Sequence, residues 1–366
     1  MNGGIKYILD IGSSSLRLVA VEMRQTRVIA EESVLYDGYL DGEFLTPEKL
    51  QNNLSELLTI MFEKLKKPIK EIYVGVPNDF CKCVCKRISR KFMTLHKISQ
   101  KDLNELYSSS LNFDTEVYSV INYSPMQMSL DDNYTTLSPI KKKTYSLVLD
   151  ASFILAKNSF ISMFEEYLKS LGVIKTTFIS TSLGQGLYCK QINNLNKMFA
   201  IVDVGHITTN VSVFKGEGLA LMSSFSMGGG HISSDIMQIL SMPFKEAELI
   251  KRKVILTIES EKNEDYIIPY KNTIIKSPIN ITNQIVKSRI EIIAKLVENV
   301  LSIDDVFKNL TIYLTGEGVC HYKGVKNIFK DVTNKEINLF EIPFVSVNEK
   351  YQTSKMGLIC LTKELN

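Results

Sequence analysis

The stretch Tyr7-Ile-Leu-Asp-Ile-Gly-Ser-Ser-Ser-Leu-Arg-Leu-Val-Ala-Val-Glu22 decides the expected fold. It reads as an apolar strand, a tight turn of glycine and serine, and a second strand of alternating character. The same design returns in Met198-Phe-Ala-Ile-Val-Asp-Val-Gly-His-Ile-Thr-Thr-Asn-Val-Ser-Val-Phe214, and the two segments align without a gap when Asp10 is set on Asp203. A repeat this far apart in one chain predicts two lobes of similar build, each offering one hairpin turn to a shared cleft.

The first turn has the chemistry of a phosphate site. Glycine lets the main chain approach a ligand closely, so the N–H groups of Gly12 and its serine neighbours can surround an anion. Asp10 and Asp203 would lie at the floor of the cleft, where two carboxylates repel a polyphosphate unless a cation separates them. Mg²⁺ keeps several of its waters and needs few protein ligands, so two aspartates acting through water suffice. A single Asp-x-Gly triplet is usually a plain turn, and it is the duplication that favours phosphate binding.

Two further glycine signals follow the second hairpin. In Ser226–Ile236 three glycines precede a run with helical spacing and a candidate serine cap, which predicts either a helix N-terminus near an anion or a flexible turn. In Leu310–Cys320 an apolar strand ends at Gly316-Glu-Gly318, and strand ends of this kind face ligand crevices. Between them, Glu248 and Lys251 share a helix face, and we expect them to pair on the surface.

Composition limits the function. A chain of 366 residues suits two lobes, and 45% hydrophobic with 23% charged residues is typical of a globular protein. The net charge of +3 is too small to indicate nucleic-acid binding. Neither a signal peptide nor an apolar stretch of about 20 residues is present, which predicts a cytoplasmic protein. Cys81, Cys83 and Cys85 could hold a soft metal on one face of a strand, but without a second cysteine pair or a histidine we expect reduced, half-buried thiols.

In chain order, these motifs resemble those of the actin-like ATPases, and within that group those of FtsA. The segments Ile285–Glu291 and Ser354–Thr362 extend the resemblance over nearly the whole chain. It implies an α/β, actin-like (ribonuclease H-like, duplicated) two-lobed ATPase fold with a small inserted α+β subdomain. The motifs that carry the resemblance are Asp10-Ile-Gly-Ser-Ser-Ser15, Asp203-Val-Gly-His-Ile-Thr-Thr-Asn210, Gly228-Gly-Gly230, Ala247-Glu248 with Lys251, and Leu314-Thr-Gly-Glu-Gly318.

The resemblance also implies domain boundaries. Between the two hairpins the sequence reads strand, helix, strand, strand, over Cys83–Phe92, Gln100–Ser110, Val117–Leu130 and Thr144–Ala156. FtsA-like proteins carry a small interaction subdomain of this order. The expected units are residues 1–80 and 158–196 for the core of lobe 1 (IA), closed by 348–366; 81–157 for the inserted subdomain (IC, SHS2-like); 197–244 and 306–347 for the core of lobe 2 (IIA); and 245–305 for subdomain IIB.

By the same resemblance the chain binds ATP with Mg²⁺, the metal being held through water by Asp10 and Asp203. Arg17 would approach the terminal phosphates, and Glu248 and Lys251 the ribose or base. The first phosphate turn would be Asp10, Gly12, Ser13, Ser14 and Ser15, and the second Asp203, Gly205, Thr208 and Thr209; the α-phosphate and adenosine would be covered by Gly228, Gly229, Gly230, Gly316, Glu317 and Gly318.

The chain departs from the family pattern at the second turn. Family members usually show Gly-Gly-Thr-Thr-Asp where this chain has His206, Ile207, Thr208, Thr209 and Asn210. Side chains at the first two positions restrict the loop, and an amide cannot act as an acid or base or attract a metal as Asp would. We therefore expect at most weak ATP hydrolysis. His206 is either a phosphate contact or a solvated side chain.

The sequence assigns no general base. Gln185 and the hydroxyl cluster Thr176–Ser182 lie where this superfamily often keeps a water-positioning residue. At the other end of the chain, Gly357–Leu365 is too short and too lightly basic for the amphipathic membrane helix of FtsA proteins and is expected to close the core.

The leading interpretation is an ATP-binding cell-division protein that polymerises and links the FtsZ ring to other division components. It would act in the cytoplasm at the inner face of the membrane at the division site. Because Gly357–Leu365 does not suit the membrane helix, either the sequence is trimmed or membrane contact goes through a partner. The alternative is a PilM-like or degenerate actin-like scaffold, in which the inserted subdomain grips a peptide without ATP turnover. A small-molecule kinase on the same fold is a weaker third interpretation.

Overall fold

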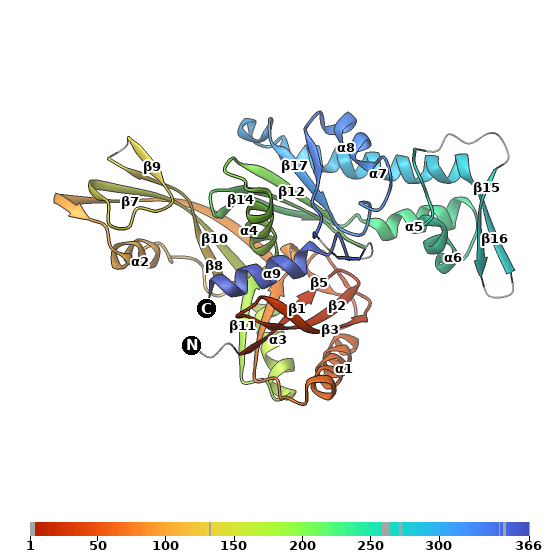
Figure 1. The fold of residues 1–366 in the computed structure, drawn as a ribbon, viewed down its shortest axis with the longest axis horizontal. Coiled ribbons are helices and arrows are strands. Elements are labelled where there is room, and N and C mark those ends of the chain that lie inside the picture. The colour runs from red at the N-terminus through yellow and green to blue at the C-terminus, as the bar shows by residue number, and fades with distance from the viewer. Residues whose placement is uncertain are drawn as a thin grey trace.

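The computed structural model describes residues 4–131, 133–257, 264–270, 273–343, 345–346 and 349–365. Two five-stranded sheets form its centre, and one arm extends from each side (Figure 1). None of the helices in the described ranges combines the length and apolar character that a bilayer span requires.

The first sheet has the order β11-β6-β1-β2-β3. Strands β1, β2 and β3 form an antiparallel meander. Strand β6 pairs in parallel with β1, and β11 pairs in parallel with β6. Helix α1 (Pro47–Leu65) shows why the sheet is covered: its buried residues, from Leu50 to Met61, recur every three or four positions and so form one apolar face. The strands are β1 (Ile5–Ile11), β2 (Ser15–Glu22), β3 (Arg27–Leu35), β6 (Glu71–Val76) and β11 (Lys175–Ser180).

The second sheet repeats this topology as β14-β13-β12-β17-β18. Again three antiparallel strands are followed by two parallel ones, and the hairpin of β12 and β13 takes the place of the hairpin of β1 and β2. The expected duplicated, two-lobed α/β architecture is therefore confirmed. The strands are β12 (Phe199–Val204), β13 (Thr209–Lys215), β14 (Gly218–Phe225), β17 (Thr311–Thr315) and β18 (Ile337–Leu339).

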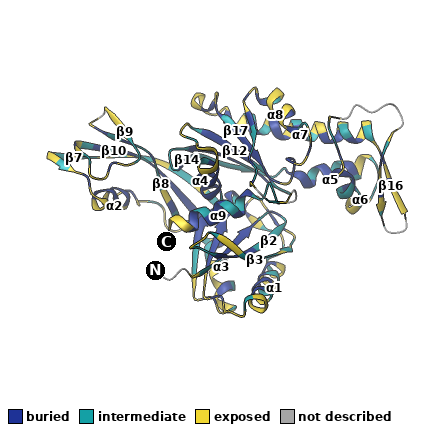
Figure 2. Ribbon diagram, in the orientation of Figure 1, coloured by how far each residue is buried: buried dark blue, intermediate teal, exposed yellow. Residues whose placement is uncertain are grey.

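Two helices cross between the sheets, α4 (Thr181–Asn193) and α9 (Thr353–Glu364). They meet at Gly184 and Gly357, where a Cβ added to Gly184 would lie 2.5 Å from the carbonyl oxygen of Gly357. The helix backbones therefore touch, which only glycine permits. An apolar cluster around this crossing joins residues of both sheets, among them Ile8 and Phe214, and both helices lie among the buried residues at the centre of the molecule (Figure 2).

The arm on the left of Figure 1 is a separate four-stranded sheet of order β7-β10-β8-β9 with one helix, α2. It has its own apolar core, which includes Leu103, Leu147 and Phe153. The observed order of strand, helix and two long strands agrees with the sequence expectation, and the short β9 is additional. The elements are β7 (Cys81–Lys97), α2 (Gln100–Ser108), β8 (Tyr118–Leu130), β9 (Tyr134–Thr136) and β10 (Lys143–Lys157).

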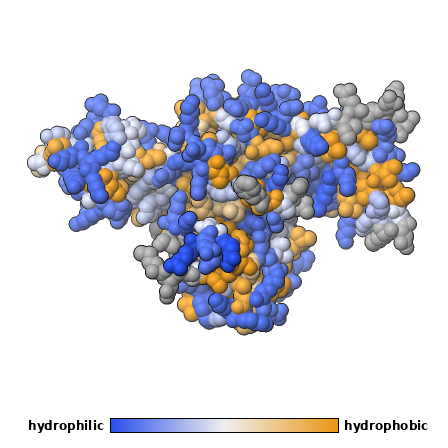
Figure 3. Space-filling view, viewed as in Figure 1, coloured by the Kyte–Doolittle hydropathy of each residue, from blue (hydrophilic) through white to orange (hydrophobic). Residues whose placement is uncertain are grey.

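The opposite arm consists of helices and the β15–β16 hairpin. The outer face of this hairpin exposes Ile267 and Ile274, in a region where apolar side chains gather on the surface (Figure 3). The elements are α5 (Gly229–Ile239), α6 (Phe244–Lys251), β15 (Asp265–Tyr270), β16 (Thr273–Pro278), α7 (Ile279–Leu301) and, beside β17, α8 (Val325–Thr333).

The domain boundaries proposed from the sequence remain predictions, and the one at 347/348 lies outside the described residues.

Candidate functional site

The two repeated hairpin turns meet between the sheets. Each is closed in the same way: the N–H of Gly12 donates to the Ser15 carbonyl at 2.9 Å, and that of Gly205 donates to the Thr208 carbonyl at 2.9 Å. The Ile207 N–H donates to Ser13 Oγ at 3.0 Å, so the turns are in direct contact. The structure thus brings both candidate phosphate turns to one place, already bonded to each other.

Asp10 lies at the end of β1, immediately before the first turn, and is only 4% exposed. Ser354 Oγ donates to its carboxylate at 2.7 Å. Burial raises the pKa of Asp10, and the nearby Arg17 guanidinium opposes that rise. Arg17 lies 3.6 Å from Asp10 and 3.1 Å from Glu31, so it is held by carboxylates of its own lobe. Its expected approach to terminal phosphates would require it to leave them.

Asp203 lies at the equivalent position of β12. Gln185 of α4 donates from Nε2 to Asp203 Oδ2 at 2.6 Å and to Thr353 Oγ1 at 3.1 Å. Burial, with a smaller contribution from the negative charge of Asp10, raises the pKa of Asp203 to about 6. The first turn of α9 therefore reaches both carboxylates, one directly through Ser354 and the other through Gln185.

These groups fit a hydrated magnesium ion. The negative charge of Asp10 raises the pKa of Asp203, and a cation between the two carboxylates would stabilise both in their ionised form. Asn210 stands opposite Asp203 on β13, and its buried Oδ1 has no hydrogen-bond partner, which leaves one more oxygen free to accept from water. Within the described residues no three His, Cys, Asp or Glu side chains converge. The donor set therefore suits Mg²⁺ held mainly through its own waters.

The candidate glycines pack backbone against backbone. The N–H of Gly229 donates to the Gly205 carbonyl at 2.9 Å, that of Gly230 to the His206 carbonyl at 2.7 Å, and that of Gly318 to the Val204 carbonyl at 2.8 Å. The first amides of α5 are thus occupied by the second turn, and a phosphate would have to displace these bonds to reach them.

The expected serine cap of α5 is wrong. The helix begins directly after Gly228, whose N–H donates to His231 Nδ1 at 3.1 Å. Close packing explains why glycine is required here, because a Cβ on Gly228 would lie 2.5 Å from the Gly205 carbonyl oxygen. A serine at this position could not approach the turn as closely.

Glu248 and Lys251 pair as expected, but not on the surface. Lys251 Nζ lies 2.7 Å from Glu248 Oε2, and its side chain is only 5% exposed. Nζ also donates to the Gly229 carbonyl at 3.2 Å, so the pair fixes the start of α5. Burial and the positive charge of Lys251 lower the pKa of His206, and the same two causes bring the pKa of His321 to about 4.

The remaining candidates line the same region. Thr208 is buried, and Thr209 Oγ1 donates to the Met227 carbonyl at 2.6 Å. The Ser14 carbonyl accepts from the Tyr36 N–H at 3.1 Å. Gln352 donates to Glu317 Oε1 at 3.1 Å. Gly316 has φ +95° and a Cβ there would lie 2.5 Å from Asp203 Oδ1, so glycine is needed for both reasons.

The sequence reasoning missed Asp79. Its Oδ2 is buried without a hydrogen-bond partner, and burial raises its pKa to about 6. Asp79 follows the end of β6. Strand β6 lies next to β1 as β17 lies next to β12, and the end of β17 was predicted from the sequence to face the ligand crevice. Comparing the two lobes strand by strand would have identified it. Ser354, at the start of α9, was also not predicted as a site residue, because it has no counterpart motif in the other lobe.

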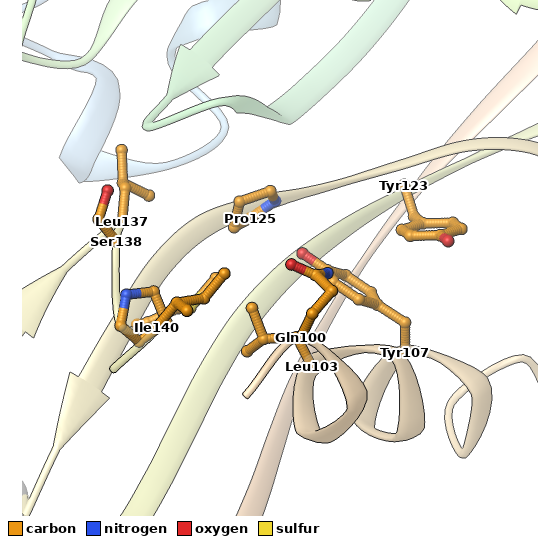
Figure 4. A pocket seen from close by; sticks show the side chains of 10 residues that line it. Gln100, Leu103, Tyr107, Tyr123, Pro125, Leu137, Ser138 and Ile140 are labelled. Atoms are coloured by element: carbon orange, nitrogen blue, oxygen red, sulfur yellow. The ribbon is translucent and has the colours of Figure 1, made fainter. Parts of the chain in front are cut away.

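A cavity of about 350 Å³ lies away from the aspartates, in the left arm between α2 and β8 (Figure 4). Tyr107 and Tyr123 stand together at one side, with ring centroids 4.5 Å apart, and the loop through Ile140 forms the other side. The lining residues are Gln100, Leu103, Tyr107, Tyr123, Pro125, Met128, Leu137, Ser138, Pro139 and Ile140.

Comparison with known proteins supports the resemblance. Residues 200–355 match the sequence profile of the family "Cell division protein FtsA". The cell division protein FtsA of Bacillus subtilis is 21% identical over 376 residues, which cover 98% of this chain and 84% of that protein.

Solved structures agree on the fold. A PilM–PilN type IV pilus biogenesis complex superposes with a TM-score of 0.61 at 14% identity, over 99% of this chain and 98% of that one. MreB5 of Spiroplasma citri bound to AMPPNP superposes with a TM-score of 0.58 at 11% identity, over 100% and 98% of the two chains. At these identities the structures establish the fold alone, which is the actin-like ATPase fold.

Proposed function

We propose that this chain, which is similar to FtsA in sequence and has the actin-like ATPase fold, is an ATP-binding cell-division protein that polymerises and links an FtsZ-like ring to other division components. The observation that carries the proposal is the pair of repeated turns, which are bonded to each other and follow the strands that carry Asp10 and Asp203, where the negative charge of Asp10 acts on Asp203. The resemblance to FtsA supports the division partners. The nucleotide-bound MreB5 supports a nucleotide ligand.

ATP would lie between the lobes with Mg²⁺ attached to its phosphates. The ion would neutralise phosphate charge, while Asp10 and Asp203 orient its waters. Ser13, Thr208 and the turn amides would donate to phosphate oxygens once the contact between the turns opens. Lys251 and Glu248 of α6 lie against the start of α5, and they would stand beside the ribose or base. These roles, and the domain boundaries given above, are part of the proposal.

The nucleotide would act mainly as a switch. A ligand held by both lobes favours one arrangement by its differential affinity for that arrangement. Hydrolysis is expected to be weak, because Asn210 cannot accept a proton as Asp would, and the side chains of His206 and Ile207 restrict the turn. The protein would act in the cytoplasm, at the membrane of the division site.

Nucleotide binding is tested by titrating a fluorescent ATP analogue with Mg²⁺ against the wild-type chain and the Asp203→Asn and Asp10→Asn variants. We expect saturable binding that weakens at least roughly tenfold in both variants, since each removes one of the two charges facing the metal. Asp150→Asn, in the left arm, is the matched control. Equal binding by all four proteins would refute the site.

Polymerisation is tested separately, by light scattering and electron microscopy with ATP, with ADP and without nucleotide. Filaments that form only with ATP support the switch. Identical behaviour in the three conditions would refute it, even if ATP binds.

A PilM-like scaffold is the second candidate, and two observations favour it. The direct bond between Ser13 and Ile207 closes the turns on each other, and the cavity between α2 and β8 offers an apolar recess in the arm that would hold a peptide. In that case ATP with Mg²⁺ would leave the melting temperature unchanged, whereas the ATP-binding protein would be stabilised by its ligand.

A further inference from the structure

A cluster of three sulfur atoms lies on one face of the left arm, apart from the nucleotide site. Cys83 and Cys85 are two positions apart on β7, so their side chains point to the same face. Cys85 Sγ lies 3.9 Å from Met126 Sδ on β8. Both thiols also point at the Leu219 carbonyl oxygen, at 3.3 and 3.5 Å.

The strand arrangement explains how these side chains meet. β10 lies between β7 and β8, and its residue directly opposite Cys85 is Ser152. Because serine is small, the longer Met126 side chain can cross above it toward β7. Met126 lies at the bulge of β8 between Pro125 and Gln127, which is where the register with β10 shifts. The sulfur atoms are thus carried by two strands of one sheet, each paired with β10, a more rigid support than a loop.

We propose that Cys83, Cys85 and Met126 form a three-sulfur binding site for a cuprous ion. A metal bonded to three sulfurs at about 2.3 Å places them about 4 Å apart, and the separation of Cys85 and Met126 is 3.9 Å. Thiolate and thioether ligands select Cu(I) over harder metals. Within the residues that the structure describes, no His, Asp or Glu joins two cysteines to complete a zinc-type set.

The surroundings allow the ion to enter and to be held. Cys85 is exposed and Cys83 is half-buried, so the site opens to solvent on one side. Binding would deprotonate both thiols and release two protons, and two thiolates with one Cu(I) carry a net charge of −1. The positive charge of Lys215 acts on Cys85 and would offset this charge. Since both thiols face Leu219 of β14, the ion would sit where the left arm meets the second sheet.

The test is a competition titration of the full, reduced chain with Cu(I) and the chelator bicinchoninate under anaerobic conditions. We expect one ion per chain, with X-ray absorption showing three sulfur neighbours. Cys83→Ser and Cys85→Ser should each weaken binding by roughly a hundredfold and Met126→Leu by roughly tenfold. Cys360→Ser, which removes a thiol elsewhere in the fold, is the control and should leave affinity unchanged.

The Met126→Leu variant separates this site from any chance pair of thiols. Leucine keeps the volume, so folding is preserved, and only the thioether is lost. The sulfur count should fall from three to two. The proposal is overturned if the chain does not take up Cu(I) against the chelator, or if Met126→Leu matches the wild type in both affinity and sulfur count. Neither result depends on whether ATP binds.

Discussion

Replacing Ile207 by alanine should strengthen nucleotide binding. In the structure the Ile207 N–H bonds to Ser13 Oγ at 3.0 Å, and the Ile207 side chain packs on the bare backbone of Gly38, where an added Cβ would lie 2.8 Å from Cδ1. A phosphate that accepts from both turns must stand between them. The turns therefore have to separate by several ångströms before the ligand fits, and whatever holds them together opposes binding.

The size of the effect follows from the burial of this side chain. Truncating a fully buried isoleucine to alanine costs about 2–5 kcal/mol. Ile207 is half-buried, so about half of that energy, about 1–2.5 kcal/mol, should be lost from the contact, while the backbone N–H remains. If that contact must open for ATP to enter, its loss appears as an affinity gain of roughly five- to seventyfold.

The assay is titration of a fluorescent ATP analogue with Mg²⁺, with circular dichroism to confirm folding. Ile239→Ala provides the control, because it makes the same chemical change at a side chain that is 60% exposed. An Ile207→Ala protein that folds normally but binds no more tightly than wild type would show that the contact between the turns does not oppose nucleotide binding.

Three other variants test the packing and charge of the site by urea unfolding. Gly184→Ala should lose about 1–3 kcal/mol, because its Cβ would lie 2.5 Å from the Gly357 carbonyl oxygen; an unchanged midpoint would contradict the direct crossing of α4 and α9. Lys251→Met should lose about 1–3 kcal/mol, because it leaves Glu248 and the Gly229 carbonyl without this donor, whereas the exposed Lys295→Met should be neutral. Asp203 has a folded-state pKa of about 6, above its value of 3.8 when unfolded, so its contribution favours the folded state at low pH and is lost as pH rises through 4 to 6. Asp203→Asn should therefore gain about 2 kcal/mol relative to wild type between pH 4.5 and 7.5 in the absence of Mg²⁺, and a constant difference would contradict the raised pKa.

Local pattern was enough to predict the architecture. The apolar strand, glycine turn and alternating strand around Asp10 and Asp203 depend on residues adjacent in sequence, and their repetition predicted two equivalent sheets. The left arm was predicted for the same reason, because each of its long strands and its helix has a clear periodicity.

Contacts between distant segments could not be predicted in this way. The bond from Ile207 to Ser13 joins residues that are 194 positions apart, and its existence depends on how closely the lobes approach. The burial of Lys251 depends on α5 packing against α6, although its pairing with Glu248 follows from helix spacing alone. Met126 reaches Cys85 only because a bulge places it beside a small residue on the intervening strand. Each of these requires the register of strands or the packing of helices to be known first.

The contact of Gly184 with Gly357 has a mechanical consequence for the whole molecule. Helices α4 and α9 lie between the sheets and meet at this point, and we expect their close backbone contact to act as a pivot about which one lobe can rotate on the other. The β7 sheet and the β15–β16 hairpin extend from it in opposite directions as lever arms (Figure 1). A small rotation of one lobe on the other would displace the ends of these two arms more than any other part of the molecule. A neighbouring molecule bound to either end would therefore be displaced when the lobes open or close.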